Sequence, residues 1–400
     1  MRKLLYIPFY SQQDKTNGKI LLNADANMRV MKMLFSILKE FFEIHVVVPS
    51  VGLLSNENDI LIFDDAKWLQ SLKVFPNNMI QRFHFDAFEY CKIFDGDEYD
   101  LIINNTPELT KNILSCYKYV TGKFTHIISI NHFPMINEFH ISGHDQVISY
   151  EQRQHESLFC SSLSVVFSKY IREIYLDEGP CVDEQISQWP LSFDSKEIAS
   201  HFNDKQFFNY KSKNEVRFVF PNRLSTTNYS NHIPFIEGVK IFARILKTVT
   251  GKSDFSIAFT NTTKSISKEW LMNNVPNCIC PDTFDRKDYL KLLASSDFSI
   301  SLMDDLHGGI AVREGMALGC LPIIRNIHSF GFTIPENYPL FVKSLEPTHI
   351  AAVLHNAYLM KSNCRSLYES FYKIFDDEDF GIVENKDKII CDVLRFIGGN

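Results

Sequence analysis

The sequence lacks any apolar run of the about 18 residues that a membrane-spanning helix needs. Its longest apolar stretches, such as IHVVVPSVGLL from Ile44, have the length of a strand. The amino-terminal MRKLLYIPFY carries a basic pair and a short apolar stretch but no small-residue cleavage site, so it predicts a first strand and not a secretory signal. We expect no stable membrane insertion and a cytoplasmic location.

Paired cysteine spacing is also absent. The nine cysteines are an odd number without a repeated interval, which indicates reduced and mostly buried thiols. Cys278 and Cys280 alternate along an expected strand, and His140 and His144 have Gly143 between them and no Glu of the zinc-protease pattern. The sequence therefore predicts no metal site in either place.

The chain has no general excess of basic residues, and its net charge is −7. Residues 1–39 carry seven Lys and Arg against two Asp and Glu, whereas residues 40–190 carry ten against twenty-two. Residues 191–400 carry twenty-four of each. This profile excludes a broad nucleic-acid-coating face and leaves only a local basic strip near the amino terminus.

What is present is a regular alternation of strand-like and helical segments over 400 residues, enough for two domains. The alternation predicts two doubly wound α/β domains with parallel sheets, whose ligands bind beyond the carboxyl ends of the strands. The alternation of strand-like and helical segments stops in a polar, aromatic-rich segment. We therefore expect a domain over residues 1–190, a linker over 191–214, a second domain over 215–380 and a final helix within 381–400.

The stretch LHGGIAVREGMALGCLPII, from Leu306 to Ile324, predicts a glycine turn, a short helix and a buried strand. Gly308 and Gly309 let backbone amides approach an anion, and the helix N-terminus adds partial positive charge, a setting that suits a diphosphate. Glu314, early in the helix, can accept two hydrogen bonds from a ribose diol. Gly319 fits the helix C-terminus.

Two other loops of the second domain follow expected strands. Arg223, in FPNRLS, can donate a bidentate pair of hydrogen bonds to a phosphate, or else cap the following helix at the surface. Asp282 and Thr283 end a strand where a base can stack or bond to the backbone, and Arg286 to Asp288 begin a helix. Asp285 there can simply be the N-cap of that helix.

Together these segments resemble the nucleotide-sugar motif of GT-B glycosyltransferases, especially the large retaining family 4. The resemblance covers residues 217–326 well, and the first domain only in its order of strands and helices. It implies a GT-B fold, with two Rossmann-like domains facing across a cleft and a C-terminal helix crossing back to the first. It also implies that Arg223 holds the donor diphosphate and Glu314 the donor ribose. The expected donor-binding residues are Gly18, Arg223, Asp282, Thr283, His307, Gly308, Gly309, Ile310 and Glu314.

In the first domain, the resemblance points to the loop after the first strand, which in GT-B enzymes contains glycine and touches both substrates. Gly18 with Lys15, Asn17 and Lys19 is the candidate, and an ordinary surface loop is the alternative. His132, after the strand THIISINH, is the candidate beside the transferred sugar and the acceptor, and a packed histidine is the alternative. The candidate catalytic residues are thus His132, Arg223 and Glu314.

The sequence departs from the family pattern at two positions. Leu306 stands where the family has an acidic residue, with Asp304 and Asp305 just before it, and Asn228 stands where the family has a lysine. Lys264, or a loop shifted toward His232, is a candidate replacement for that lysine. These departures keep open a non-catalytic module that binds a nucleotide-sugar or a partner subunit, and a GT-B isomerase.

The lead hypothesis is a retaining, metal-independent glycosyltransferase that uses a UDP- or GDP-sugar and no cofactor. Asp95-Gly96-Asp97 has the D-x-D form of a GT-A metal motif, but it precedes a strand in a turn-rich stretch, so we interpret it as a solvated turn.

The acceptor hypothesis rests on a weaker resemblance. The segments DLIINNTPELT and THIISINHFP are similar to the corresponding part of phage DNA α-glucosyltransferases. They favour a 5-hydroxymethylated base in double-stranded phage DNA, and with it the host cytoplasm as the location. The acidic residues 40–190 oppose DNA, and a bacterial surface polysaccharide or lipopolysaccharide acceptor is the alternative.

Overall fold

The chain divides into two compact units. Unit 1 comprises Met1–Ser192 with Gly381–Asn400, and unit 2 comprises Phe193–Phe380. The computed structural model describes residues 2–8, 31, 34–48, 69–74, 87–131, 147–177, 182–189, 202, 209–212, 214–222, 224, 230–260, 266–281, 286–303, 309–327, 334–375 and 386–397. No helix among these residues combines the length and apolar character needed to cross a bilayer.

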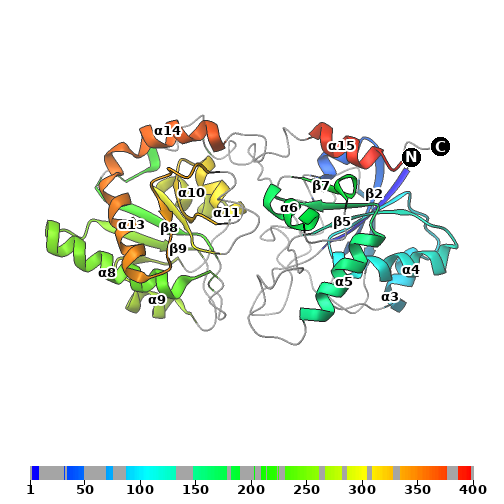
Figure 1. Cartoon of the computed structure of the whole chain (residues 1–400), viewed down its shortest axis with the longest axis horizontal. Coiled ribbons are helices and arrows are strands. Elements are labelled where there is room, and N and C mark those ends of the chain that lie inside the picture. Colours follow the sequence, from blue (N-terminus) through cyan, green and yellow to red (C-terminus); the bar gives the residue numbers. More distant parts are fainter. Residues whose placement is uncertain are drawn as a thin grey trace. The chain divides into compact units, whose positions relative to one another are not determined.

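Unit 1 is built on a parallel sheet with the strand order β3-β2-β1-β4-β5-β6-β7 among its described residues (Figure 1). Its strands are β1 (Arg2–Ile7), β2 (Phe42–Val48), β3 (Leu69–Val74), β4 (Leu101–Asn104), β5 (His126–Ile130), β6 (Leu163–Val166) and β7 (Ile186–Gln188). Its helices are α3 (Ala87–Phe94), α4 (Thr110–Thr121), α5 (Val147–Cys160), α6 (Lys169–Asp177) and α15 (Lys386–Leu394), with short 3-10 turns at Pro107–Leu109 and Asp183–Gln185.

Unit 2 has a parallel sheet with the order β10-β9-β8-β11-β12-β13 among the residues described there. The strands are β8 (Val216–Phe220), β9 (Phe255–Phe259), β10 (Cys278–Ile279), β11 (Phe298–Ser301), β12 (Leu321–Arg325) and β13 (Phe341–Val342). The helices are α8 (His232–Thr250), α9 (Lys268–Asn274), α10 (Arg286–Ser295), α11 (Ile310–Ala317), α13 (Pro347–Leu359) and α14 (Cys364–Phe375), with a 3-10 turn at Lys361–Asn363.

Both strand orders are doubly wound, which confirms the predicted α/β class. In each sheet the first three strands along the chain are added in one direction. The fourth strand then returns to pair with the first strand on its other side. In unit 2 this switch point lies between β8 and β11, which pair directly. Loops at the carboxyl ends of the strands flanking such a point form the usual binding crevice of open α/β sheets.

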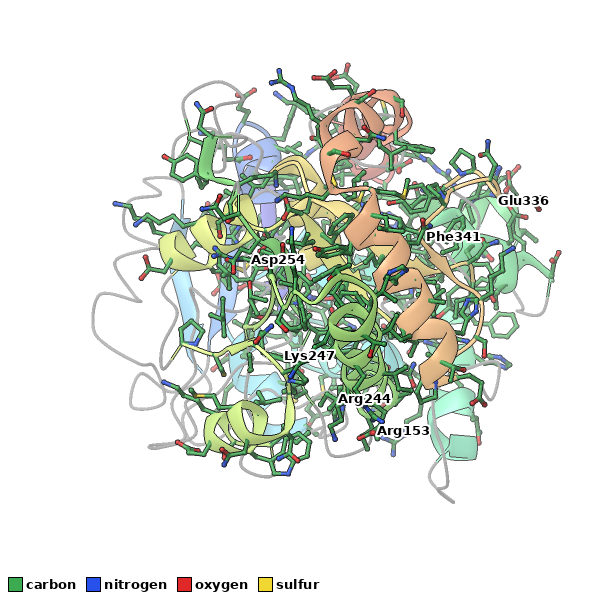
Figure 2. All side chains as sticks on the ribbon, turned by 90° about the vertical axis from the view of Figure 1, so that its left-hand side faces the viewer. Arg153, Arg244, Lys247, Asp254, Glu336 and Phe341 are labelled. Carbon is green, nitrogen blue, oxygen red and sulfur yellow. The ribbon has the colours of Figure 1, made fainter. Side chains whose placement is uncertain are left out.

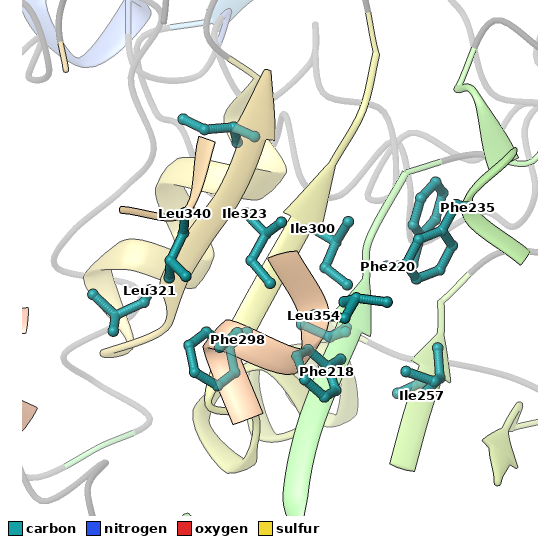
Figure 3. Close-up of a cluster of buried hydrophobic side chains, with 14 of the residues drawn as sticks. Phe218, Phe220, Phe235, Ile257, Phe298, Ile300, Leu321, Ile323, Leu340 and Leu354 are labelled. Carbon is teal, nitrogen blue, oxygen red and sulfur yellow. The ribbon is translucent and has the colours of Figure 1, made fainter. Parts of the chain in front are cut away.

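The core of unit 2 explains the abundance of phenylalanine. Strand β8 has a fully apolar, buried carboxyl half, as strands covered on both faces require. The rings of Phe218 and Phe298 stack at 5.2 Å between centroids, and those of Phe220 and Phe235 at 4.9 Å (Figure 3). Helix α8 packs against α13, and α10 against α11. Stacked aromatic pairs across β8, β11 and α8 fix the position of the strands that carry the switch point.

The outer surface of α8 is basic. Arg244 and Lys247 are exposed on it and lie on the side of unit 2 that faces the viewer in Figure 2. On the side of the same helix that faces α13, a Cβ added to Gly238 would lie 2.7 Å from the Ile350 side chain, so α8 and α13 approach closely at that glycine.

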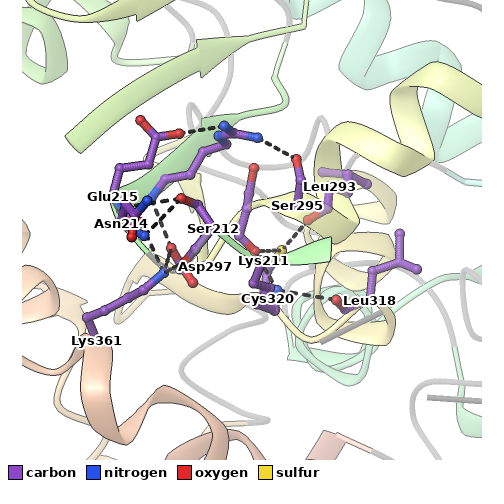
Figure 4. A network of polar contacts seen from close by, with 12 residues as sticks. Lys211, Ser212, Asn214, Glu215, Leu293, Ser295, Asp297, Leu318, Cys320 and Lys361 are labelled. Carbon is purple, nitrogen blue, oxygen red and sulfur yellow. Dashed lines mark hydrogen bonds and ion pairs between the residues drawn. The ribbon is translucent and has the colours of Figure 1, made fainter. Parts of the chain in front are cut away.

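The segment expected to be a linker, residues 191–214, is counted with unit 2 from Phe193 onward. Phe202 is buried, and Lys211 donates hydrogen bonds to the carbonyl oxygens of Ser296 at 2.5 Å and Leu318 at 3.5 Å (Figure 4). The described part of this segment is therefore fastened to unit 2.

Helix α15 belongs to unit 1 although it ends the chain. Its Ile389 and Val393 are buried, and Asp392 accepts hydrogen bonds from the Ser187 hydroxyl and from Trp189 Nε1, the latter at 2.9 Å. The expected C-terminal helix that returns to the first domain is thus present.

Candidate functional site

The carboxyl ends of β8 and β11 are joined by asparagine side chains. Asn222, after β8, is buried and donates from Nδ2 to the Ser301 hydroxyl at 2.9 Å and to the Ile300 carbonyl at 3.4 Å. Asn231, in a left-handed conformation with φ 51°, donates to the Leu302 carbonyl at 2.6 Å. These bonds end on the last two residues of β11 and on Leu302 directly after it, so they hold the loop after β8 and the start of α8 against the switch point.

Helix α8 begins at this edge with a buried histidine. His232 is 2% exposed and its Nδ1 lies 2.9 Å from the Ser230 hydroxyl. Burial lowers the pKa of His232, so its neutral form predominates at pH 7. Its burial and lowered pKa do not favour His232 as the second cation, and the source of that cation stays a prediction.

Helix α11 begins at the same edge, after β11. Its N-cap is Gly309 with φ 35° and ψ 114°, and the helix ends in a left-handed Gly319 with φ 77°. Cys320 N donates to the Gly315 carbonyl and Gly319 N to that of Met316, which is a Schellman ending. The predicted short helix, C-terminal glycine and buried strand are confirmed, whereas most of the predicted turn lies outside the described residues.

Gly315 permits the close contact of α11 with the sheet. A Cβ at this position would lie 2.9 Å from Ser299 Cβ and 3.0 Å from its hydroxyl oxygen. The helix therefore lies directly on β11, with its N-terminus at the carboxyl edge, where the aligned peptide dipoles favour an anion.

Glu314 is a buried carboxylate on this helix. It is 1% exposed, and its Oε1 accepts a hydrogen bond of 2.7 Å from Nη2 of Arg286, the first residue of α10. The Arg286 side chain is 23% exposed and its guanidinium carbon lies 5.5 Å from the centroid of the Tyr289 ring. Sequence reasoning treated Arg286 only as part of a helix start and missed this pair, which depends on α10 and α11 being neighbours.

Of the predicted donor-binding residues, Gly309, Ile310 and Glu314 lie together on α11. Arg223, Asp282, Thr283, His307 and Gly308 lie outside the described residues, as do the unit 1 candidates Lys15, Asn17, Gly18, Lys19 and His132. Leu306, Asn228 and Lys264 also lie outside them. The roles of all these residues stay predictions.

The corresponding edge of unit 1 is lined with small polar side chains. Asn104 Nδ2 donates to the Thr110 hydroxyl at 3.0 Å, and that hydroxyl lies 2.8 Å from the Ser129 hydroxyl. Asn131, just before His132, is buried, and its Nδ2 donates to the Ser129 carbonyl at 3.1 Å. Within the described part of the chain its Oδ1 has no hydrogen-bond partner. Sequence reasoning singled out His132 and overlooked this amide beside it.

The D-x-D stretch lies in the turn after α3, as interpreted from the sequence. Gly96 has φ 76°, and Asp97 accepts a hydrogen bond of 2.9 Å from Lys3 on β1. Asp97 therefore pairs with a lysine across the amino-terminal end of the sheet, away from the carboxyl edges of the strands.

The chain matches no sequence-family model and no curated protein. Its structure is similar to that of sucrose-phosphate synthase from Thermosynechococcus elongatus, with a TM-score of 0.70, 11% identity and coverage of 100% of both chains. It is also similar to a glycosyltransferase from Rickettsia africae (TM-score 0.65, 12% identity, 100% of this chain and 99% of that one). A third similar structure is Anabaena HepE in complex with UDP and glucose (TM-score 0.64, 14% identity, 100% of both chains). At these identities the likeness establishes the fold, which is that of the GT-B glycosyltransferases.

Proposed function

We propose that the chain is a glycosyltransferase that takes a sugar from a nucleotide-sugar donor and transfers it to an acceptor hydroxyl. The observation that carries the proposal is the buried Glu314 carboxylate on a helix that begins at Gly309, beside the switch point of unit 2. Burying a carboxylate is costly, and stability alone does not favour it over an apolar residue. Binding of a polar ligand at this edge accounts for the buried Glu314 carboxylate.

The two helix N-termini at this edge suit a nucleoside diphosphate. Helix α8 starts beside the end of β11, and α11 starts after it, so both dipoles favour negative charge there. Anabaena HepE, of similar fold, was solved with UDP and with UDP-glucose. We place the diphosphate near Gly309 and Arg223, and the ribose diol on Glu314.

The proposed catalysis rests on charge stabilisation and positioning. Backbone amides near Gly309 and the Arg223 guanidinium stabilise the leaving diphosphate, while His132 lies beside the transferred sugar and the acceptor. Lys15, Asn17, Gly18 and Lys19 are proposed to contact the acceptor side. Retention of configuration and independence of metal ions are parts of the proposal, and excess chelator should leave activity intact.

A 5-hydroxymethylated base in DNA is the proposed acceptor, with a cytoplasmic location, the host's cytoplasm if a phage encodes the chain. The second candidate is a bacterial surface glycan, which the excess of acidic residues over residues 40–190 favours because acidic residues repel DNA.

The deciding experiment incubates the enzyme with hydroxymethylcytosine DNA, or with glycan and lipid acceptors, and a panel of UDP- and GDP-sugars. Digestion of the DNA to nucleosides and mass spectrometry should detect a hexose or pentose mass gain. Transfer only to a glycan or lipid would reject the DNA acceptor and keep the enzyme class. Nucleotide-sugar binding without transfer or slow donor hydrolysis would instead indicate a non-catalytic binding module.

A further inference from the structure

The contact between Arg286 and Glu314 joins two helices at the proposed donor edge. Arg286 opens α10, directly after residues 282–285, which carry the expected base-binding positions Asp282 and Thr283. Glu314 lies on α11, which begins at Gly309. The 2.7 Å bond thus connects the segment expected beside the base to the carboxylate expected beside the ribose.

The burial of the two partners is unequal. Glu314 is 1% exposed, whereas the Arg286 side chain is 23% exposed. Burying a carboxylate so deeply is costly unless charged or hydrogen-bonding groups replace the lost water. Arg286 supplies one such group, because its Nη2 forms an ion pair of 2.7 Å with Oε1 of Glu314.

The geometry also limits how Glu314 can turn. The bond runs from Nη2 of Arg286 to Oε1 of Glu314, and a planar guanidinium donates in fixed directions, whereas the ammonium of a lysine rotates freely. Arg286 is itself restrained, because its guanidinium lies over the Tyr289 ring one turn along α10. This bond therefore restrains the Glu314 carboxylate from the α10 side.

We infer that Arg286 is a positioning residue that holds the Glu314 carboxylate oriented for the donor ribose, and thereby sets a preference for ribonucleotides over 2′-deoxyribonucleotides. The inference rests on the proposed function. A carboxylate fixed in this orientation accepts two hydrogen bonds from a ribose diol. A deoxyribose lacks one of the two hydroxyls and so loses one of these bonds. Without Arg286 the carboxylate turns away from this orientation, and the advantage of the second hydroxyl disappears.

The test measures the affinity of the full chain for UDP and 2′-deoxy-UDP, and for GDP and 2′-deoxy-GDP, by calorimetry. For the preferred base, the wild-type protein should bind the ribonucleotide about tenfold or more tightly than its deoxy counterpart, the ratio expected for one hydrogen bond to a charged group. Arg286→Gln should bring this ratio close to one. Lys287→Gln, which removes the exposed cation one position further on, is the matched control and should keep the wild-type ratio.

Arg286→Lys keeps a positive charge at the same position and guards against a folding defect in Arg286→Gln. It should lower the ratio at least about threefold, because an ammonium does not fix the carboxylate. A merely structural pair would change the unfolding midpoint of these variants and leave the ratio unchanged. That result would overturn the inference, as would a wild-type ratio near one. Failure of the wild-type protein to bind any of the four nucleotides would instead reject the proposed function.

Discussion

Gly315 occupies a position on α11 where a methyl group has no room. A Cβ there would lie 2.9 Å from Ser299 Cβ on the underlying strand, closer than such atoms approach in proteins. Helix propensity alone predicts that alanine stabilises the helix by up to about 1 kcal/mol. Overpacking against a strand typically costs about 1–3 kcal/mol, so the steric effect should win.

We therefore expect Gly315→Ala to lower the free energy of unfolding, by up to about 2 kcal/mol. Urea denaturation of the full chain measures the change. Adding Ser299→Gly removes the clashing Cβ and should recover part of the loss, after allowance for the cost of glycine in a strand. A more stable Gly315→Ala protein would show that α11 lies further from β11 than described.

His232 should make stability depend on pH. Its pKa in the folded protein is below the ordinary value of 6.5 because the ring is buried. The unfolded state then binds more protons than the folded state as the pH falls through 6.5, so the contribution of this group to stability is complete above that pH and decreases below it.

Replacing His232 with asparagine should flatten this dependence. The free energy of unfolding, measured between pH 7.5 and 5.5, should fall less steeply in His232→Asn than in the wild-type protein. Equal slopes in the two proteins would contradict the buried, neutral state assigned to His232.

At the scale of elements, Lys361 fastens three segments of unit 2 together. Its Nζ donates to the Asp297 carboxylate at 2.6 Å and to the carbonyl oxygens of Ser212 at 2.9 Å and Glu215 at 3.1 Å (Figure 4). Asp297 is 2% exposed and also accepts a hydrogen bond from Arg217 N at 2.9 Å. The lysine thus neutralises a buried carboxylate at the amino end of β11.

Lys361→Met should destabilise the protein by about 3 kcal/mol, because it leaves that carboxylate buried without its cation. Lys343→Met, at an exposed lysine of the same unit, is the control and should change stability by less than about 0.5 kcal/mol. Similar unfolding curves for the two variants would show that the Lys361 contacts contribute little.

One aspartate contributes polar contacts to the attachment of α15. Asp392 joins the helix to Ser187 and Trp189 in unit 1. Asp392→Ala should cost about 1–3 kcal/mol, since the buried indole N–H loses its acceptor. The thiol of Cys391, which is already exposed, should react as it does in the wild-type protein. Amide hydrogen exchange along α15 should accelerate. Asp387→Ala, at an exposed position of the same helix, should leave both stability and exchange unchanged.

Elements with a strong local signal could be predicted from the sequence. Strand β8 and helix α8 carry a buried apolar run and a helical apolar period, and both appear where expected. The short strands β7 and β13 could not, because two or three residues carry no recognisable period. Helix α13 has a proline in its first turn and a buried apolar face against α8, a signal that the sequence reading passed over.

The residues of the candidate site also divide into those with a local sequence signal and those without one. The turn and helix around Gly309 and Glu314 are local in sequence and were predicted. The Arg286–Glu314 pair spans 28 residues and follows from the packing of α10 on α11, which no local pattern reports. Asn222 and Asn231 were missed because their partners are backbone and hydroxyl groups at the end of β11, known only once the strand order is known.

At the scale of the whole molecule, the two ends of the chain belong to unit 1, and the proposed donor edge belongs to unit 2. Gly309, Glu314 and Arg286 all lie within unit 2, so nucleotide binding there can be measured without an acceptor. The affinity for a nucleoside diphosphate therefore tests the proposed donor site independently of which hydroxyl compound receives the sugar.

The most direct test is calorimetric titration of the full chain with UDP and GDP. We expect the wild-type protein to bind one of them, and Glu314→Gln to weaken that binding at least about tenfold through loss of a charged acceptor for the ribose. Glu336→Gln, at an exposed glutamate of unit 2, is the control and should bind as the wild-type protein does. Absence of binding of either nucleotide to the wild-type protein, or unchanged affinity in Glu314→Gln, would contradict the assignment of this edge as a nucleotide-sugar site.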